Sequence, residues 1–273
     1  MDQSNAVYIW WAFMSCIAAL NLVLLYLSFK AYKKRLPAYS DLLAFVRTWH
    51  MRLAAIYVFG CGFRSILPRG DVRRIVLVDH WISAVAIGRS VATIAELSFA
   101  AQWAFILFEI GRSTQNKFAL LASKVIVPLI IIAEIFSWYA CTTGNYFGTI
   151  IEESLWAVCA GIFVIGMFKA LKYYEKKQLM FIRLALISGL GYFTYMITVD
   201  VPSYIRGFIS NQADGKVYSG VMEGIVEVAT QWRLTHVYDD WKYEFVWMTL
   251  YFSLAVWGSM LIVNSPRLDK LKY

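Results

Sequence analysis

Long apolar stretches separated by short polar ones run along the whole chain of 273 residues. The hydrocarbon core of a bilayer is about 30 Å thick and a helix rises about 1.5 Å per residue, so roughly 20 apolar residues make one crossing. Seven stretches reach or approach this length: residues 8–29, 50–67, 81–108, 118–140, 149–168, 179–199 and 245–263. The pattern therefore predicts an all-α membrane bundle of seven transmembrane helices, in a single integral membrane domain that spans residues 1–273.

The composition favours the same class. Hydrophobic residues make up 60% of the chain and charged residues 16%, against roughly 45–50% and about 25% in soluble proteins. The second stretch is the weakest of the seven, because it is short and contains Arg64. It reaches the length of a crossing if the helix begins further back, near Leu42, and the predicted topology requires this span.

Lysine and arginine are expected in excess on the cytoplasmic side of a membrane protein. With the N-terminus outside, 17 of the 26 basic residues lie inside, 8 lie outside, and Arg89 lies within a span. This distribution predicts an N-terminus outside and a cytoplasmic C-terminus, in the membrane of a cell or an organelle. The net charge of +8 is then mainly an orientation signal, and membrane lipids rather than nucleic acid are the expected partners.

One segment outside the predicted spans is long, residues 201–243, and is predicted as an outer loop between the sixth and seventh helices. Its part from Val217 to Leu234 reads as an amphipathic helix. Val217, Val221, Ile225 and Val228 fall on the apolar side of this helix, and Glu227 falls on the polar side. Two interpretations remain open: a surface helix packed on the bundle, or a lid over a cavity.

Three charged residues lie deep within predicted spans and are the main candidates for function, because an ionisable group at this depth is costly unless it is paired or hydrated. Arg89 and Glu134 lie at similar depths, about 12 Å and 9 Å from the outer helix ends, which predicts an Arg89–Glu134 ion pair. Glu96 shares a helix face with Arg89. The alternative is a structural clasp that fixes the helix register.

Further ionisable residues gather near the outer ends of the helices: Arg64, Glu153, Asp200, His80 before the third span, and Glu227 in the outer loop. They extend the candidate site to an outward-facing cavity. Glu152 is interpreted instead as part of a capping box with Thr149, in which it accepts a backbone hydrogen bond at the helix start. Arg69, Arg73 and Arg74 are interpreted as a solvated patch or one that contacts lipid headgroups.

A metal site formed by His80, His236 and Asp239 is a minority hypothesis. His236 and Asp239 are three residues apart and would share a helix face. However, the chain has no H-E-x-x-H motif, and zinc sites usually have three well-spaced protein ligands. No motif in the sequence indicates a cofactor.

Two functions from different classes follow from these residues. The first is a membrane-embedded enzyme or binding protein that acts on a lipid or another hydrophobic small molecule, with Glu134 and Glu153 near Arg89 and His80 for acid–base chemistry. The alternative is a transporter or ion-coupled carrier that uses Arg89, Glu96 and Glu134. A structural subunit of a larger membrane complex is the third possibility.

Overall fold

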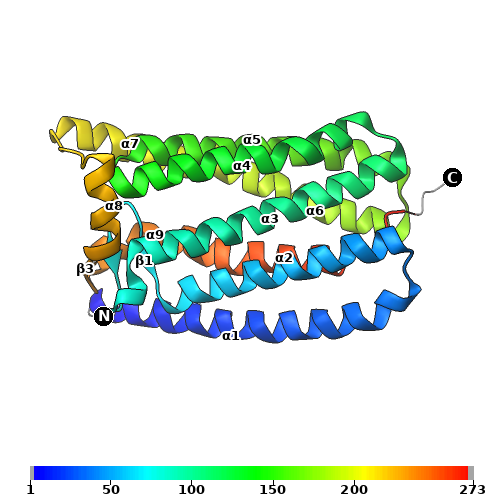
Figure 1. Ribbon diagram of the computed structural model, residues 1–273, viewed down its shortest axis with the longest axis horizontal. Coiled ribbons are helices and arrows are strands. Elements are labelled where there is room, and N and C mark those ends of the chain that lie inside the picture. The colour runs from blue at the N-terminus through cyan, green and yellow to red at the C-terminus, as the bar shows by residue number, and fades with distance from the viewer. Residues whose placement is uncertain (1–2, 270–273) are drawn as a thin grey trace. The chain divides into compact units, whose positions relative to one another are not determined.

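The computed structural model describes residues 3–269 and is almost entirely helical (Figure 1). Lys270 and Lys272, which contribute to the count of basic residues, lie outside the described residues. Within the described part of the chain, seven helical spans are long and apolar enough to cross a membrane, as the sequence predicted. These spans are Asn5–Ala38, Asp41–Ile66, Val85–Thr114, Lys117–Thr143, Tyr146–Tyr173, Lys176–Ala213 and Tyr238–Val263.

Short elements connect or interrupt the long helices, and η marks a short 3₁₀ or π-helical turn. In chain order the elements are α1 (Gln3–Arg35), η1 (Leu36–Ala38), α2 (Asp41–Ile66), β1 (Arg69–Gly70), β2 (Ile75–Val76), η2 (Trp81–Ser83), α3 (Val85–Thr114), α4 (Lys117–Thr143), α5 (Tyr146–Ala170), η3 (Leu171–Tyr173), α6 (Lys176–Tyr195), η4 (Met196–Asp200), α7 (Val201–Ala213), α8 (Val221–Thr230), β3 (Arg233–Leu234), α9 (Tyr238–Leu250), η5 (Tyr251–Ala255) and α10 (Val256–Val263).

The second span has the longer of the two predicted extents, with its start close to Leu42. Helix α2 begins at Asp41 rather than near residue 50, and it includes Arg47 and His50 in its early turns. Both side chains are buried, with exposed fractions of 1% and 0%. The polar residues that shortened the apolar stretch in the sequence are therefore covered by protein, which is how a membrane helix tolerates them.

The predicted outer loop over residues 201–243 was too long at both ends. The sixth span continues to Ala213 and the seventh begins at Tyr238, so the connection covers only residues 214–237. Pro202 lies inside the sixth span, although proline lacks the N–H that an α-helix requires and clashes with the preceding turn. The π-helical turn η4 ends at Asp200, two residues before this proline, and such a turn accommodates the mismatch without ending the helix.

The described chain divides into two compact units. Unit 1 contains residues 3–98, 138–145 and 218–263, and unit 2 contains residues 99–137, 146–217 and 264–269. Helices α3 and α4 contribute residues to both units. Each unit has its own buried polar residues, and these are described separately.

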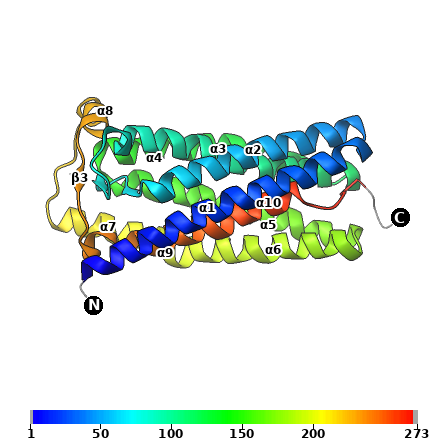
Figure 2. The same ribbon diagram turned by 90° about the horizontal axis from the view of Figure 1, so that it is seen from below.

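In unit 1, α1 runs beside α2 (Figure 1) and along α9 and α10 (Figure 2). Asn21 of α1 is 1% exposed. Its Nδ2 donates to the carbonyl of Phe252 at 2.8 Å, and its Oδ1 accepts from the indole of Trp257 at 2.9 Å. Phe252 lies in the π-helical turn η5, where the helical hydrogen-bond ladder changes. Asn21 therefore satisfies a backbone carbonyl that would be costly to leave unpaired inside a membrane protein.

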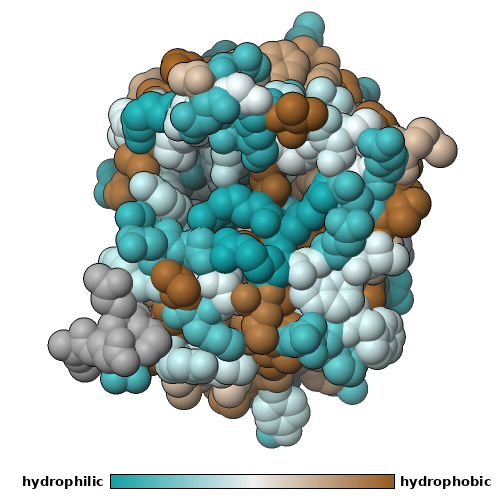
Figure 3. All heavy atoms as spheres, turned by 90° about the vertical axis from the view of Figure 1, so that its left-hand side faces the viewer, coloured by the Kyte–Doolittle hydropathy of each residue, from teal (hydrophilic) through white to brown (hydrophobic). Residues whose placement is uncertain are grey.

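One end of unit 1 carries a cap, which we define as residues 67–84 and 218–237. In the cap, β1 pairs antiparallel with β2, and β2 pairs parallel with β3. Hydrophilic side chains cover much of the face of the molecule that carries these strands (Figure 3). Helix α8 is shorter than the predicted Val217–Leu234, since it ends at Thr230 and Arg233–Leu234 form β3.

The orientation of α8 differs from the predicted amphipathic pattern. Val228 is buried, but Val217, Val221 and Ile225 are exposed. Gly224 faces the end of α4 so closely that a Cβ atom there would lie 2.0 Å from the carbonyl oxygen of Thr142. Glycine is therefore required for α8 to reach α4 at this point.

In unit 2, α5 packs against α6 and α7. An aromatic cluster surrounds Trp103 of α3, whose ring centroid lies 5.0–6.1 Å from those of Phe99, Trp156, Phe163 and Tyr192. The segment after α10 is held by Leu268. Its backbone N–H donates to Glu109 of α3, and its carbonyl accepts from the hydroxyl of Tyr174. The chain after α10 is thus attached to unit 2 by buried hydrogen bonds.

Candidate functional site

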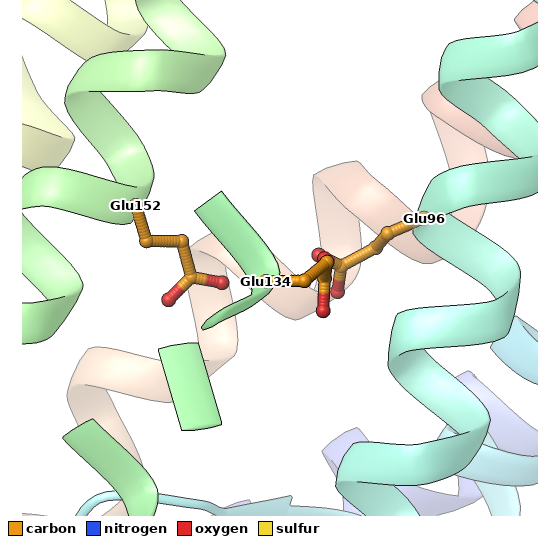
Figure 4. Close-up of side chains that lie close together, drawn as sticks. All are labelled: Glu96, Glu134 and Glu152. Atoms are coloured by element: carbon orange, nitrogen blue, oxygen red, sulfur yellow. The ribbon is translucent and has the colours of Figure 1, made fainter. Parts of the chain in front are cut away.

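The interior of unit 2 contains a pair of glutamates on neighbouring helices. Glu134 lies on α4 and Glu152 on α5, and their exposed fractions are 4% and 5%. A carboxylate oxygen of Glu134 lies within 4.8 Å of a carboxylate oxygen of Glu152. Figure 4 shows Glu152 extending from α5 towards Glu134, and it also draws Glu96 of α3, which belongs to unit 1. Two carboxylates this close inside a protein are not both ionised unless a cation compensates the repulsion.

The interpretation of Glu152 as a capping residue is wrong. Helix α5 begins at Tyr146, so Thr149 is its fourth residue and Glu152 its seventh. The free backbone N–H groups of a helix are confined to the first turn, and Glu152 lies beyond it. The hydroxyl of Thr149 has no hydrogen-bond partner among the described residues. Glu152 is therefore a candidate site residue.

The other predicted site residues of unit 2 lie on α5 and at the end of the π-helical turn. Glu153 follows Glu152 on α5 and is partly buried. Asp200, the last residue of η4, is 8% exposed and accepts a hydrogen bond of 3.5 Å from the hydroxyl of Tyr195. A π-helical turn within a membrane helix is frequently found at a functional position.

The predicted charges of unit 1 form an ion pair within α3. The guanidinium of Arg89 donates to Glu96 at 3.0 Å, and both side chains are largely buried. A cavity of about 10 Å³ lies beside Glu96, and its lining includes Arg64 and Tyr251. A cavity of this size has room for about one water molecule. The predicted Arg89–Glu134 ion pair would join the two units and stays a prediction.

Arg64 and Arg69 share one carboxylate in unit 1. Arg64 Nη2 lies 3.1 Å from Asp71 Oδ2, and Arg69 Nε lies 3.7 Å from Asp71 Oδ1. The prediction of a solvated patch is wrong for Arg69, because its exposed fraction is 0%. The sequence offered one signal for this burial: Gly88 leaves space at the start of α3, and a Cβ atom there would lie 1.4 Å from Arg69 Cζ.

The residues of the minority metal hypothesis each contact another group. His80 Nδ1 accepts a hydrogen bond from the backbone N–H of Ile82. The ring of His236 stacks on Tyr8, and its Nε2 lies 3.1 Å from the carbonyl oxygen of Leu77. Asp239 forms an ion pair with Lys242. These contacts satisfy the three side chains without a metal ion, and the metal site stays a prediction.

Glu227 fastens α8 to the rest of the cap. Its carboxylate accepts hydrogen bonds from Ser219 Oγ and from the guanidinium of Arg74, and Arg74 also donates to the carbonyl of Thr142 at 2.7 Å. Arg74 has a φ of 50°, a left-handed conformation that is costly for a residue with a Cβ atom. The contacts with Glu227 and Thr142 place Arg74 between α8 and the end of α4.

We expect acidification to loosen α8. The hydrogen bonds from Ser219 and Arg74 hold the pKa of the Glu227 carboxyl below its usual value of 4.5. A carboxyl whose pKa is lower in the folded state stabilises that state above the unfolded pKa, and this stability is lost as pH falls through the folded pKa. Hydrogen exchange of the α8 amides, corrected for the intrinsic rate, should therefore accelerate below about pH 4.5.

Glu223 on the same helix provides the matched control for this prediction. Glu223→Gln should leave the pH dependence of α8 exchange unchanged, whereas Glu227→Gln should accelerate exchange already at pH 7. Equal exchange rates in the wild type and in Glu227→Gln at pH 7 would contradict the assigned role of Glu227.

Comparison of the chain with protein-family models, with curated proteins and with solved structures finds no match. The fold and the buried polar residues thus define the class: a protein with seven helices long and apolar enough to cross a membrane, and with ionisable side chains inside both units.

Proposed function

We propose that this chain is a multi-pass membrane protein that binds a proton or a cation between Glu134 and Glu152, and that it works as an ion-coupled carrier. The single observation that carries the proposal is the approach of two buried carboxylates within 4.8 Å. Outside water, a pair of this kind keeps one proton between its members or binds a cation. Exchange of that proton or cation changes the charge inside the membrane, which is the property a coupled carrier needs.

The position of the pair supports the proposal. Glu134 and Glu152 belong to spans four and five, and the sixth span of the same unit contains the π-helical turn η4, with Asp200 at its end. Irregular turns inside membrane helices are sites where backbone groups can contact an ion or water. Glu153 and Asp200 are further acidic residues in this unit that an exchanging proton or cation can use.

Modification by a hydrophobic carbodiimide tests the pair directly, because this reagent reacts with protonated carboxyl groups. A solvated glutamate has a pKa of about 4.3 and is ionised at pH 7.5. We expect modification of Glu134 or Glu152 at pH 7.5, detected by peptide mass spectrometry, while the exposed Glu223 stays unmodified. Sodium, potassium, magnesium and calcium chlorides are then added in turn, and a cation that binds should slow the modification about tenfold.

The variants decide between the outcomes. In Glu152→Gln, no cation should protect Glu134, because one carboxylate of the site is gone, whereas Glu223→Gln should behave like the wild type. If Glu134 or Glu152 is modified and none of the cations slows the reaction, the occupant of the site is a proton. If Glu134 and Glu152 react no faster than Glu223, and no added cation changes their rates of modification, the proposed site does not exist.

A second candidate function is a membrane-embedded enzyme or binding protein that acts on a lipid or another hydrophobic small molecule. It is favoured by the same pair, since two carboxyl groups that share a proton can provide one general acid and one general base. An enzyme would convert a lipid in a cell extract and lose this activity in Glu134→Gln, as mass spectrometry of the extract would reveal. A carrier would leave the lipids unchanged.

The orientation in the membrane is part of the proposal. The excess of lysine and arginine on one side supports an N-terminus outside and a cytoplasmic C-terminus. In that orientation the cap of unit 1 lies on the outer side. Labelling of single cysteines introduced in the cap and in residues 30–35, with a reagent that does not cross membranes, tests this orientation.

A further inference from the structure

Arg69 is a buried cation whose hydrogen-bonding capacity is only partly used. Its exposed fraction is 0%, and Nη1 donates to the carbonyl of Ala84 at 3.0 Å. Its Nε and Nη2 have no hydrogen-bond partner among the described residues. A buried donor that lacks a partner is unfavourable, and the cost is greater when the group is charged. Arg69 therefore has donors available for a further ligand.

The charges around Arg69 do not balance within its immediate group. Arg64 and Arg69 share the single carboxylate of Asp71, which leaves one positive charge in excess. Burial lowers the pKa of the Arg69 guanidinium to about 10, so that the side chain is still a cation at neutral pH. A buried charge without an equal counter-charge is unfavourable and requires compensation.

Further hydrogen-bond donors lie beside Arg69. Its guanidinium lies on the first turn of α3, where Gly88 leaves the space, and the N-terminus of a helix carries a partial positive charge and free N–H groups. Ser83, adjacent to Ala84, is 2% exposed, and its Oγ also has no hydrogen-bond partner among the described residues. Two buried side chains with unused donors thus lie at one helix N-terminus.

We propose that Arg69, Ser83 and the N-terminus of α3 form a binding site for one small monovalent anion of the halide type. The single excess charge matches one monovalent anion, and the unused donors Arg69 Nη2 and Ser83 Oγ favour an anion over a cation. The complete burial of Arg69 and of the neighbouring Ile75 and Val76, each 0% exposed, favours a small anion over a phosphate or a lipid headgroup. This site is separate from the Glu134–Glu152 pair and does not depend on the proposed function.

Thermal unfolding of the full chain in an uncharged detergent tests the anion site. Sodium gluconate is replaced stepwise by sodium chloride, and in a second series by sodium bromide, at constant ionic strength. A ligand that binds only the folded state raises the unfolding temperature in a saturable way. We expect a rise of about 2–4 °C at saturation, because gluconate is too large to replace a halide in a buried site.

Three variants make the result specific. Arg69→Met should abolish the chloride effect, and in gluconate it should unfold no earlier than the wild type, since it leaves Arg64 and Asp71 as a balanced pair. Ser83→Ala should raise the chloride concentration at half-saturation about tenfold, for one lost hydrogen bond. Arg206→Met removes an exposed arginine and should retain the wild-type response.

Several results would overturn the anion site. One is an unfolding temperature of the wild type that is the same in chloride and in gluconate, which would leave ordered water as the partner of Arg69. Another is a chloride effect of equal size in Arg69→Met, which would place the anion elsewhere. If Arg69→Met does not fold, Ser83→Ala decides alone, and an unchanged half-saturation in that variant rejects the proposal.

Discussion

Gly88→Ala is expected to lower the free energy of unfolding by more than about 3 kcal/mol. The added methyl group would lie 1.4 Å from Cζ and 1.6 Å from Nη1 of Arg69, so the guanidinium would have to leave its place. Arg69 is fully buried and interacts there with Ala84 and Asp71, and displacement of a buried charge from its partners is among the most destabilising changes. Thermal unfolding in detergent, or unfolding by denaturant, measures the loss.

The control is Gly62→Ala in α2, where a Cβ atom would meet nothing within 4 Å. Alanine favours a helix over glycine by about 1 kcal/mol, so this variant should be as stable as the wild type or more stable. The double variant Arg69→Ala/Gly88→Ala should recover at least about 1 kcal/mol relative to Gly88→Ala, because the clash has been removed. A Gly88→Ala protein as stable as the wild type would contradict the position assigned to Arg69.

Trp103→Ala is expected to cost about 3–5 kcal/mol in the free energy of unfolding. Trp103 is 6% exposed, and its ring contacts four other aromatic rings in unit 2. Its removal would leave a cavity that the surrounding rings can fill only in part. Unfolding by denaturant measures the cost, and near-UV circular dichroism reports the loss of aromatic packing.

Phe168→Ala provides the comparison for Trp103→Ala, because Phe168 lies on α5 and is 65% exposed. Its truncation should change the stability by less than about 1 kcal/mol. Trp103→Phe should retain part of the packing, so its loss of stability should lie between those of Trp103→Ala and Phe168→Ala. If Trp103→Ala and Phe168→Ala cost the same, the aromatic cluster is not the core of unit 2.

The aromatic cluster also touches the candidate site. Trp156 lies one turn after Glu152 on α5 and contacts Trp103 edge to face, with ring centroids 5.9 Å apart. A collapse of the cluster would therefore shift the turn of α5 that carries Glu152. For this reason, the carbodiimide reactivity of Glu152 should change in Trp103→Ala but not in Phe168→Ala.

The seven helices of membrane-spanning length could be predicted because the length and hydrophobicity of a segment are local properties of the chain. Errors arose where a local signal for a break was overridden. The sixth stretch was predicted to end at residue 199, but the span continues through the π-helical turn η4 and past Pro202 to Ala213. The second stretch was predicted to start at residue 50, but α2 begins at Asp41 and packing buries its polar residues Arg47 and His50.

The candidate site was predictable only in part. Glu134 was identified because a carboxylate deep in an apolar span is costly and therefore informative. Glu152 was set aside because Thr149-x-x-Glu152 matches a capping box, and the distinction depends on whether α5 begins at Tyr146 or at residue 149. Local sequence locates a helix end only to within a few residues, so the two interpretations could not be separated.

The sequence by itself determined that the chain has seven helices of membrane-spanning length and that several of them carry charges, since both properties are set by residues adjacent in the chain. Only the tertiary structure decided which charges meet. Glu134 and Glu152 approach one another, Arg69 is buried against the glycine at position 88, and Arg74 holds α8 on the end of α4. The physical reason is that a contact between helices depends on their rotation and depth relative to one another, which packing fixes and which no single segment specifies.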